Sequence, residues 1–209
     1  MSNIERRYHI GQNVEIRSEG DKKVVRGYAA VFNSNSQDLG GFIERIAPTF
    51  FDSVLTDDVR VLKNHDSHYV LGRTTAGTAR IFKDERGLVF EYDDPGTTYS
   101  NDLSISISRG DISQCSFGFV VGKDEWTKRK DGVIERILLE CQALYDVGPV
   151  TYPAYTDTSV AVRSMEKILK EEQLAKDEAA KKDIERAKEI LEAQRSIDQL
   201  TIGYLKTFF

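Results

Sequence analysis

Histidine is scarce in this 209-residue chain, and the three histidines are the first candidates for chemistry: His9, His65 and His68. Imidazole titrates near neutral pH, so an acid–base step at that pH depends on this small set. Two of the three share the segment 64–68, Asn-His-Asp-Ser-His. Three interpretations of the segment stay open: a solvated strand end, a metal site, and a general base for a nucleophile elsewhere in the chain.

The metal interpretation has the least support. His65 and His68, with Asp66 between them, supply two or three ligands, but no further group of histidines or cysteines completes a shell. Zinc normally takes three or four well-spaced ligands. The sequence therefore predicts neither a bound metal nor another cofactor. A general base instead requires that the fold bring a hydroxyl or a thiol within about 3 Å of the imidazole.

A thiol and a hydroxyl stand side by side at Cys115 and Ser116. The run 114–121, Gln-Cys-Ser-Phe-Gly-Phe-Val-Val, is typical of a strand, in which alternate side chains share a face. Cys115 then shares the core face with the large apolar residues, whereas Ser116 faces outward beside Gly118, which leaves space for a substrate backbone. Gln114 interrupts a Gly-x-Ser-x-Gly elbow, so this local pattern makes Ser116 a candidate nucleophile and leaves Cys115 as a rival.

A serine–histidine pair usually needs a third group, which holds the imidazole tautomer and stabilises its positive charge. Asp66 is adjacent to His65 and on a strand would point the other way, which disfavours it. The groups that stay open for this role are His68, Glu91, Asp93 and Asp146.

The elements that must position these residues are mostly strands. Residues 1–163 hold all four prolines and short runs of Val, Ile, Phe and Tyr between turn signals. The expected elements are hairpins at 14–17 with 24–32, 79–82 with 88–92 and 115–126 with 133–147, a strand at Asp58–His65, and helices at Pro48–Leu55 and Thr98–Ser108. We expect a β-dominated α+β fold, an antiparallel β-barrel with a few flanking helices, because so large a sheet must hide its edges.

Residues 164–209 read as a charged helical extension with an apolar end. Ser164 to about Ser196 is rich in Lys, Glu, Ala, Ile and Leu and has no Gly or Pro, which predicts a long helix. Apolar residues return between Leu200 and Phe209, as either a docking segment or a tail folded back on its own domain.

Composition narrows the setting in which the chain works. A net charge of -5 argues against broad affinity for nucleic-acid phosphates. No apolar run approaches the roughly 20 residues of a membrane helix, and the first residues lack a signal segment. We therefore expect a cytosol-like compartment, in which Cys115 and Cys141 stay free thiols.

Several blocks, in one order along most of the first 155 residues, resemble a known family. The blocks are Arg26–Phe32, Glu44–Pro48, Val61–Asp66, Leu71–Thr74, Gly87–Glu91, Arg109–Ile112, Ser116–Phe119 and Asp146–Tyr155. They resemble the tailed-phage prohead proteases, which mature the capsid and are related in fold to the herpesvirus assemblins.

The resemblance implies roles for individual residues. It implies that Ser116 is the nucleophile, that His65 is the base and that Asp146 is the third member. Where many relatives have Ser after the valine of the Asp-Val block, this chain has Gly148. In the assemblins the third member is a second histidine, which keeps His68 as an alternative.

The resemblance also implies a function. The chain would be a serine endopeptidase that cleaves the scaffolding segment of the major capsid protein, and itself, during procapsid maturation. It would act in the host cell cytoplasm, inside the procapsid, with that capsid segment and other copies of itself as partners, and with neither nucleic acid nor membrane. The rival of another class is a catalytically inactive scaffold or assembly protein of the same fold. Enzymatic rivals are a cysteine peptidase using Cys115 and a metallohydrolase using His65 and His68.

Overall fold

The structure, a computed structural model, describes residues 4–9, 14–20, 22–152 and 159–206. The chain divides into two compact units, 1–162 and 163–209. Within the described residues, none of the helices is both long enough and apolar enough to cross a membrane.

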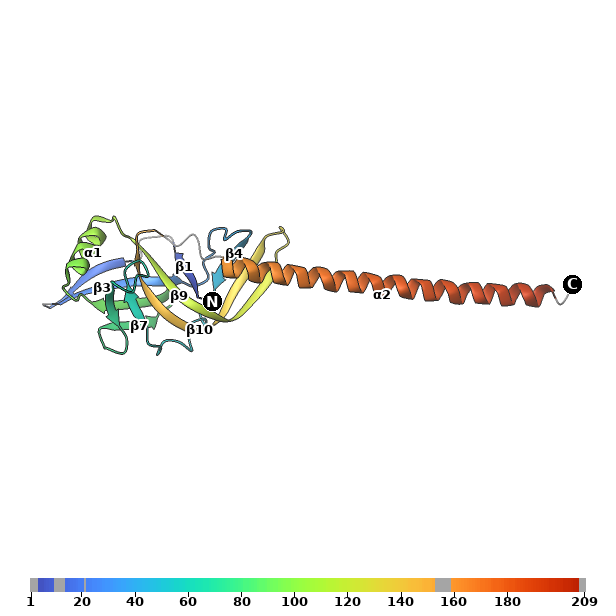
Figure 1. Cartoon of the computed structure of the whole chain (residues 1–209), viewed down its shortest axis with the longest axis horizontal. Helices are drawn as coiled ribbons and strands as arrows, with labels where there is room; N and C mark the ends of the chain where they lie inside the picture. Colours follow the sequence, from blue (N-terminus) through green and yellow to red (C-terminus); the bar gives the residue numbers. More distant parts are fainter. Residues whose placement is uncertain (1–3, 10–13, 21, 153–158, 207–209) are drawn as a thin grey trace. The chain divides into compact units, whose positions relative to one another are not determined.

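The first unit is built mainly from strands (Figure 1). The strands are β1 (Glu5–His9), β2 (Val14–Glu19), β3 (Lys22–Val31), β4 (Phe42–Ile46), β5 (Arg60–Leu62), β6 (Val70–Arg73), β7 (Ala79–Lys83), β8 (Gly87–Asp93), β9 (Gln114–Lys128) and β10 (Ile134–Val150), and the helices are α1 (Thr98–Arg109) and α2 (Ser159–Lys206). The described strands form a six-stranded sheet in the order β1-β9-β10-β5-β6, with β4 also paired to β10, and a four-stranded sheet in the order β2-β3-β8-β7. The three expected hairpins, β2–β3, β7–β8 and β9–β10, are confirmed.

The β-dominated fold is confirmed, but a closed antiparallel barrel is not. The strands lie in two separate open sheets, and β4 and β5 run parallel to β10. The reason lies in β10, which has 17 residues and several shifts in its pairing with β9. Its first half pairs with β4 and its last residues pair with β5, so one long strand takes two short partners on the same side.

The two short helices expected in the first unit have different outcomes. Helix α1 is confirmed: Thr97 accepts a hydrogen bond from the backbone N–H of Ser100, and the helix ends at Gly110 with φ of 82°. The helix expected at 48–55 is wrong, because this segment is a series of turns with N–H groups bonded three residues back. Phe50 and Phe51 are both fully buried, and adjacent helical residues lie about 100° apart, so burial of both outweighs the helical signal.

The core lies between the two sheets. It joins apolar side chains of both sheets, among them Val25, Leu88, Phe90, Tyr92, Phe117, Phe119, Leu144 and Val147, with Phe50 and Phe51 from the turns. The ring centroids of Phe51 and Phe117 are 5.4 Å apart in an edge-to-face arrangement. These contacts hold one face of β9 in the core. The alternate side chains of β9 therefore lie on the opposite face of the sheet.

The expected C-terminal helix is confirmed and is longer than expected. Helix α2 is one continuous element from Ser159 to Lys206. Five large apolar side chains of this helix, Leu169, Leu174, Ile184, Ile190 and Leu191, are exposed, from 39% for Leu169 to 64% for Ile190, whereas Ala161 near its start is buried. The predicted apolar end at 200–209 lies outside the residues whose side chains the structure describes.

Candidate active site

Three side chains from different elements meet at one point of the six-stranded sheet. Ser116 lies on β9, Asp146 on β10, and His65 in the turn that follows β5. His65 Nε2 lies 2.7 Å from Ser116 Oγ, and His65 Nδ1 is hydrogen-bonded to Asp146 Oδ1. The imidazole thus bridges a hydroxyl and a carboxylate, the arrangement in which a base is both held in one tautomer and aimed at a nucleophile.

The period of β9 separates the hydroxyl from the thiol as expected. Cys115 is fully buried in the core, on the face opposite Ser116, and burial raises the pKa of its thiol far above the ordinary value. Burial likewise raises the pKa of Cys141 to about 12. Because the thiolate is the reactive form of cysteine, neither thiol is prepared for nucleophilic attack.

The turn that carries His65 has an uncommon backbone conformation. Asn64 and His65 have φ values of 56° and 58°, in the left-handed region that costs about 1–2 kcal/mol per residue for most side chains. The turn is tied to the end of β10: the N–H of Asn64 donates to Pro149 O at 3.0 Å, and the N–H of Thr151 donates to Asn64 Oδ1 at 2.7 Å. The expected strand Asp58–His65 is therefore too long, because the chain leaves the sheet after Leu62 to aim the imidazole.

Two glycines make room for the carboxylate and for the turn. Gly118 pairs with Asp146 across the sheet, and a Cβ on it would lie 2.7 Å from Asp146 Oδ2. A Cβ on Gly148 would lie 2.0 Å from the backbone oxygen of Leu62. Gly148, the departure from the family pattern, thus lets β10 approach the strand before His65. The space beside Ser116 that was expected to admit a substrate backbone is filled by Asp146.

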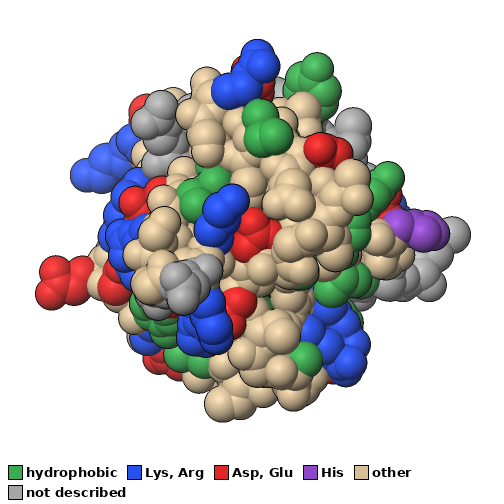
Figure 2. Space-filling view, turned by 90° about the vertical axis from the view of Figure 1, so that its left-hand side faces the viewer, with side chains coloured by type: hydrophobic (Ala, Val, Ile, Leu, Met, Phe, Trp, Pro, Cys, Tyr) green, Lys and Arg blue, Asp and Glu red, His purple; other side chains and the backbone are tan. Residues whose placement is uncertain are grey.

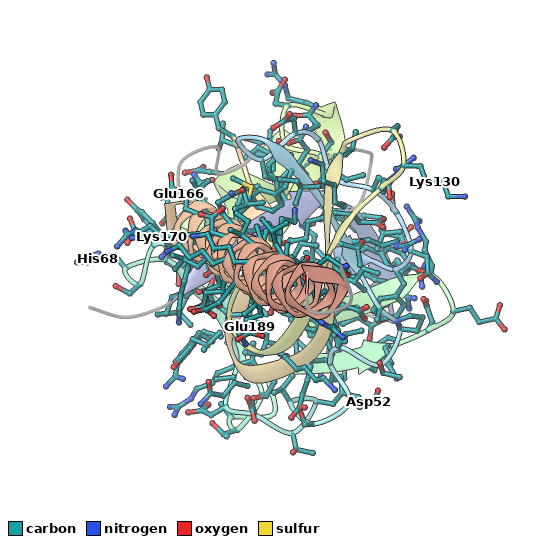
Figure 3. The ribbon with its side chains drawn as sticks, turned by 90° about the vertical axis from the view of Figure 1, so that its right-hand side faces the viewer. Asp52, His68, Lys130, Glu166, Lys170 and Glu189 are labelled. Carbon is teal, nitrogen blue, oxygen red and sulfur yellow. The ribbon has the colours of Figure 1, made fainter. Side chains whose placement is uncertain are left out.

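The other candidates for the third member lie elsewhere. The His68 side chain is 87% exposed, is hydrogen-bonded to Asp66 at 2.9 Å and projects at the periphery of the molecule (Figure 3). Glu91 is bonded to Arg26 in the four-stranded sheet, where Asp93 is bonded to Arg80. In the part of the chain that the structure describes, no three His, Cys, Asp or Glu side chains gather in a way that could hold a metal ion.

The strand that covers the site was not expected from the sequence. Ser116, expected to face outward, is fully buried, and its hydroxyl donates to the backbone carbonyl of Arg7 on β1 at 2.8 Å. Arg7 and Glu5 form a buried charge cluster with Glu44 and Arg136. The sequence signal for this cluster is weak, three consecutive charged residues at the start of β1, because the partners of Glu5 and Arg7 lie far away in the sequence.

Comparison with known proteins shows the family of the chain. Residues 12–171 match the family model described as caudovirus prohead serine protease. The prohead protease of Enterobacteria phage HK97 is 31% identical over 150 residues, which cover 70% of this chain and 64% of that relative, so the match spans less than two thirds of the relative's length. No solved structure matches significantly. Because the family model covers well over half of the chain, the protein belongs to the caudovirus prohead serine protease family.

Proposed function

We propose that this chain is a serine endopeptidase of capsid maturation, with Ser116 as nucleophile, His65 as general base and Asp146 as the group that orients the imidazole. The observation that carries the proposal is the pair of hydrogen bonds of His65, one to Ser116 Oγ and one to Asp146 Oδ1. Membership of the prohead serine protease family supports a serine peptidase that acts in capsid maturation.

The proposed mechanism follows from these contacts. His65 Nε2 takes the proton of the Ser116 hydroxyl as Oγ attacks the carbonyl carbon of the substrate, and backbone N–H groups stabilise the oxyanion. The imidazolium then gives this proton to the leaving amine, and the C–N bond breaks. A water molecule, activated by the same imidazole, hydrolyses the acyl-enzyme and regenerates Ser116. Asp146, at His65 Nδ1, stabilises the imidazolium in both halves of the reaction.

The proposed substrate is the scaffolding segment of the major capsid protein, and the chain itself is a second substrate. The description of the family as prohead serine protease, and the name of the HK97 relative as prohead protease, support a capsid partner and a site of action inside the procapsid. On the face seen in Figure 2, basic and acidic side chains lie side by side, so that face is not the single-sign surface that phosphate binding requires.

The inactive-scaffold alternative has one observation in its favour. Ser116 is buried under β1, so this conformation does not expose the nucleophile to a substrate. An enzyme whose site is covered until assembly accounts for the same observation, since small displacements in a site can lower rates about a hundredfold.

Co-expression with the capsid protein tests the proposal. The chain, as wild type or Ser116→Ala, is produced with its capsid protein, and the mass of the capsid protein is measured before and after shell assembly. Shortening with the wild type alone is the expected result. Equal capsid-protein masses with both forms would contradict the proposal and favour an assembly protein.

A further inference from the structure

Strand β1 occupies the edge of the six-stranded sheet directly beside the nucleophile. It pairs antiparallel with β9, and Tyr8 lies opposite Ser116. The segment that matches the family model begins at residue 12, after β1. An unpaired edge is a general docking place for an extended peptide, because its N–H and C=O groups can extend the sheet. Strand β1 therefore lies where a substrate strand would add to β9.

The backbone of β1 presents a peptide bond to Ser116. The Ser116 hydroxyl donates to the carbonyl oxygen of Arg7, which precedes the bond between Arg7 and Tyr8. A serine has one hydroxyl proton, so Arg7 O competes with His65 Nε2 for it. The contact is a hydrogen bond to the oxygen, whereas attack requires Oγ to approach the carbonyl carbon. Strand β1 thus resembles a bound substrate but holds the serine in an unreactive state.

The side chains of Glu5 and Arg7 are held on the opposite face of the sheet from Ser116. Arg7 lies opposite Phe117 in the register and binds Glu44 through two nitrogens, at 2.7 Å and 3.0 Å. Glu5 accepts two hydrogen bonds from Arg136, at 2.8 Å and 3.0 Å. Such two-point contacts between guanidinium and carboxylate groups are specific in geometry as well as charge. The side-chain contacts of β1 with Glu44 and Arg136 therefore lie on one face of the β1–β9 pair, and Ser116 lies on the other.

The fixed half of this cluster remains paired when β1 is absent. Arg136 Nη1 lies 2.9 Å from Glu44 Oε2, and Arg136 Nε lies 2.7 Å from Asp124 Oδ2. Release of β1 therefore leaves no isolated charge in this cluster. An isolated buried charge would cost several kcal/mol. A small pocket lined in part by Arg7, Glu44 and Phe117 borders the same region. These properties fit a site that exchanges one strand for another.

We propose that the edge of β9 beside Ser116 is the peptide-binding site, that β1 occupies it as a substrate-like strand, and that Glu44 and Arg136 are specificity-determining residues. The preferred peptide has a basic residue directly before the cleaved bond and an acidic residue two positions earlier, as Arg7 and Glu5 are arranged on β1. The inference rests on the proposed serine peptidase function and requires no reactant other than water.

Two peptides of equal composition test the specificity. The first, Ile-Glu-Arg-Arg-Tyr-His-Ile, has the sequence of residues 4–10, and the second exchanges its Glu with its second Arg. We expect cleavage before Tyr in the first peptide, with kcat/KM at least about tenfold higher than for the second, because loss of a buried charge partner costs well over that factor. Equal kcat/KM values would overturn the inference.

Two matched double variants test the occupancy of the site by β1. Glu5→Gln/Arg7→Gln removes the charges of β1, and Glu15→Gln/Arg17→Gln makes the same change at the same spacing on β2, where both side chains are about half exposed. A fluorophosphonate is the probe of Ser116. The fraction of molecules in which β1 has left β9 limits the rate of labelling. We therefore expect the first variant to be labelled at least about tenfold faster than the wild type. Labelling of the second variant should be unchanged.

The outcomes separate the inference from the function on which it rests. Labelling of Ser116 without acceleration in Glu5→Gln/Arg7→Gln would overturn the role of β1 and leave the serine peptidase intact. Failure of every form to react with the fluorophosphonate or to cleave either peptide would overturn the proposed function itself. Where the first double variant fails to fold, as judged by circular dichroism, the comparison of the two peptides with the wild type still decides the specificity.

Discussion

Strands β1 and β2 carry the same pair of residues at the same spacing, in two different environments. On β2, Glu15 and Arg17 form an ion pair whose side chains are 53% and 48% exposed, and such surface pairs contribute about 0–1 kcal/mol. On β1, Glu5 and Arg7 are almost fully buried and bind two further charged side chains. A Glu-x-Arg pattern therefore does not by itself predict a structural role. The surroundings of the two side chains decide whether they form a solvated ion pair or part of a binding site.

The largest expected effect comes from removing the residue that joins the buried cluster. Arg136→Ala leaves the carboxylates of Glu5 and Glu44 with fewer partners, and breaking a buried charge network costs about 3–5 kcal/mol of the free energy of unfolding. Arg17→Ala on β2 is the matched control, with an expected cost below about 1 kcal/mol. Urea unfolding measures both, and equal losses in the two variants would remove the contrast between the strands.

A second effect is expected at the junction of β9 and β10. Gly118→Ala places a methyl group against the Asp146 carboxylate and so displaces the partner of His65. We expect peptidase activity to fall about a hundredfold, as for other misplacements of about 1 Å in a catalytic site. Gly122→Ala on the same strand is the control, because its methyl group would also make a tight contact, 3.3 Å from the backbone of Gln142 and Glu140, but would not touch Asp146. Activity retained by Gly118→Ala would argue against a role for Asp146.

A smaller effect is expected at the turn that positions His65. Asn64→Gly keeps a residue that accepts positive φ but removes the side-chain bond to Thr151, whereas Asn64→Ala loses both advantages. We expect the free energy of unfolding to fall by about 1 kcal/mol for Gly and about 2 kcal/mol for Ala, from the bond and the backbone strain together. Measured kcat should fall in the same order, and the opposite order would contradict this account of the turn.

The smallest expected effect is the contribution of the buried Glu5 carboxylate to the pH dependence of stability. Burial alone would raise the pKa of the Glu5 carboxyl, but the hydrogen bond from Arg136 and the charges of Arg7 and Arg136 lower it below its ordinary value of 4.5. The stabilising contribution of Glu5 is therefore complete above pH 4.5 and is lost as the pH falls through the lower folded-state pKa.

Unfolding experiments between neutral pH and about pH 3 measure this contribution. The Glu5→Gln variant should lose less stability on acidification than the wild type does. Identical pH profiles for the two proteins would show that Glu5 does not titrate with folding.

Much of the fold follows from local patterns. The alternation of apolar residues from Cys115 to Val121 predicted both a strand and the burial of the thiol, and the pattern at 98–108 predicted α1. These predictions succeeded because each depends on neighbours along the chain. The helix expected at 48–55 failed because the burial of two adjacent phenylalanines, a tertiary effect, outweighed a local preference.

The site was only partly predictable for the same reason. The residues alone made Ser116 and His65 candidates and left Asp146 open beside His68, Glu91 and Asp93. The resemblance to a family then assigned the three roles. The contact of Ser116 with Arg7 and the cluster of Glu5 with Arg136 join residues more than 100 positions apart. No periodicity of one segment carries such information, so only the folded chain reveals the covering strand.

The central claim is that Ser116 is a nucleophile activated by His65, and covalent labelling tests it most directly. The full chain is treated with a fluorophosphonate, and the modified residue is identified by peptide mass spectrometry in the wild type and in His65→Ala. We expect an adduct on Ser116 in the wild type and its loss in His65→Ala. An adduct on another residue, or equal labelling of Ser116 in both proteins, would contradict it.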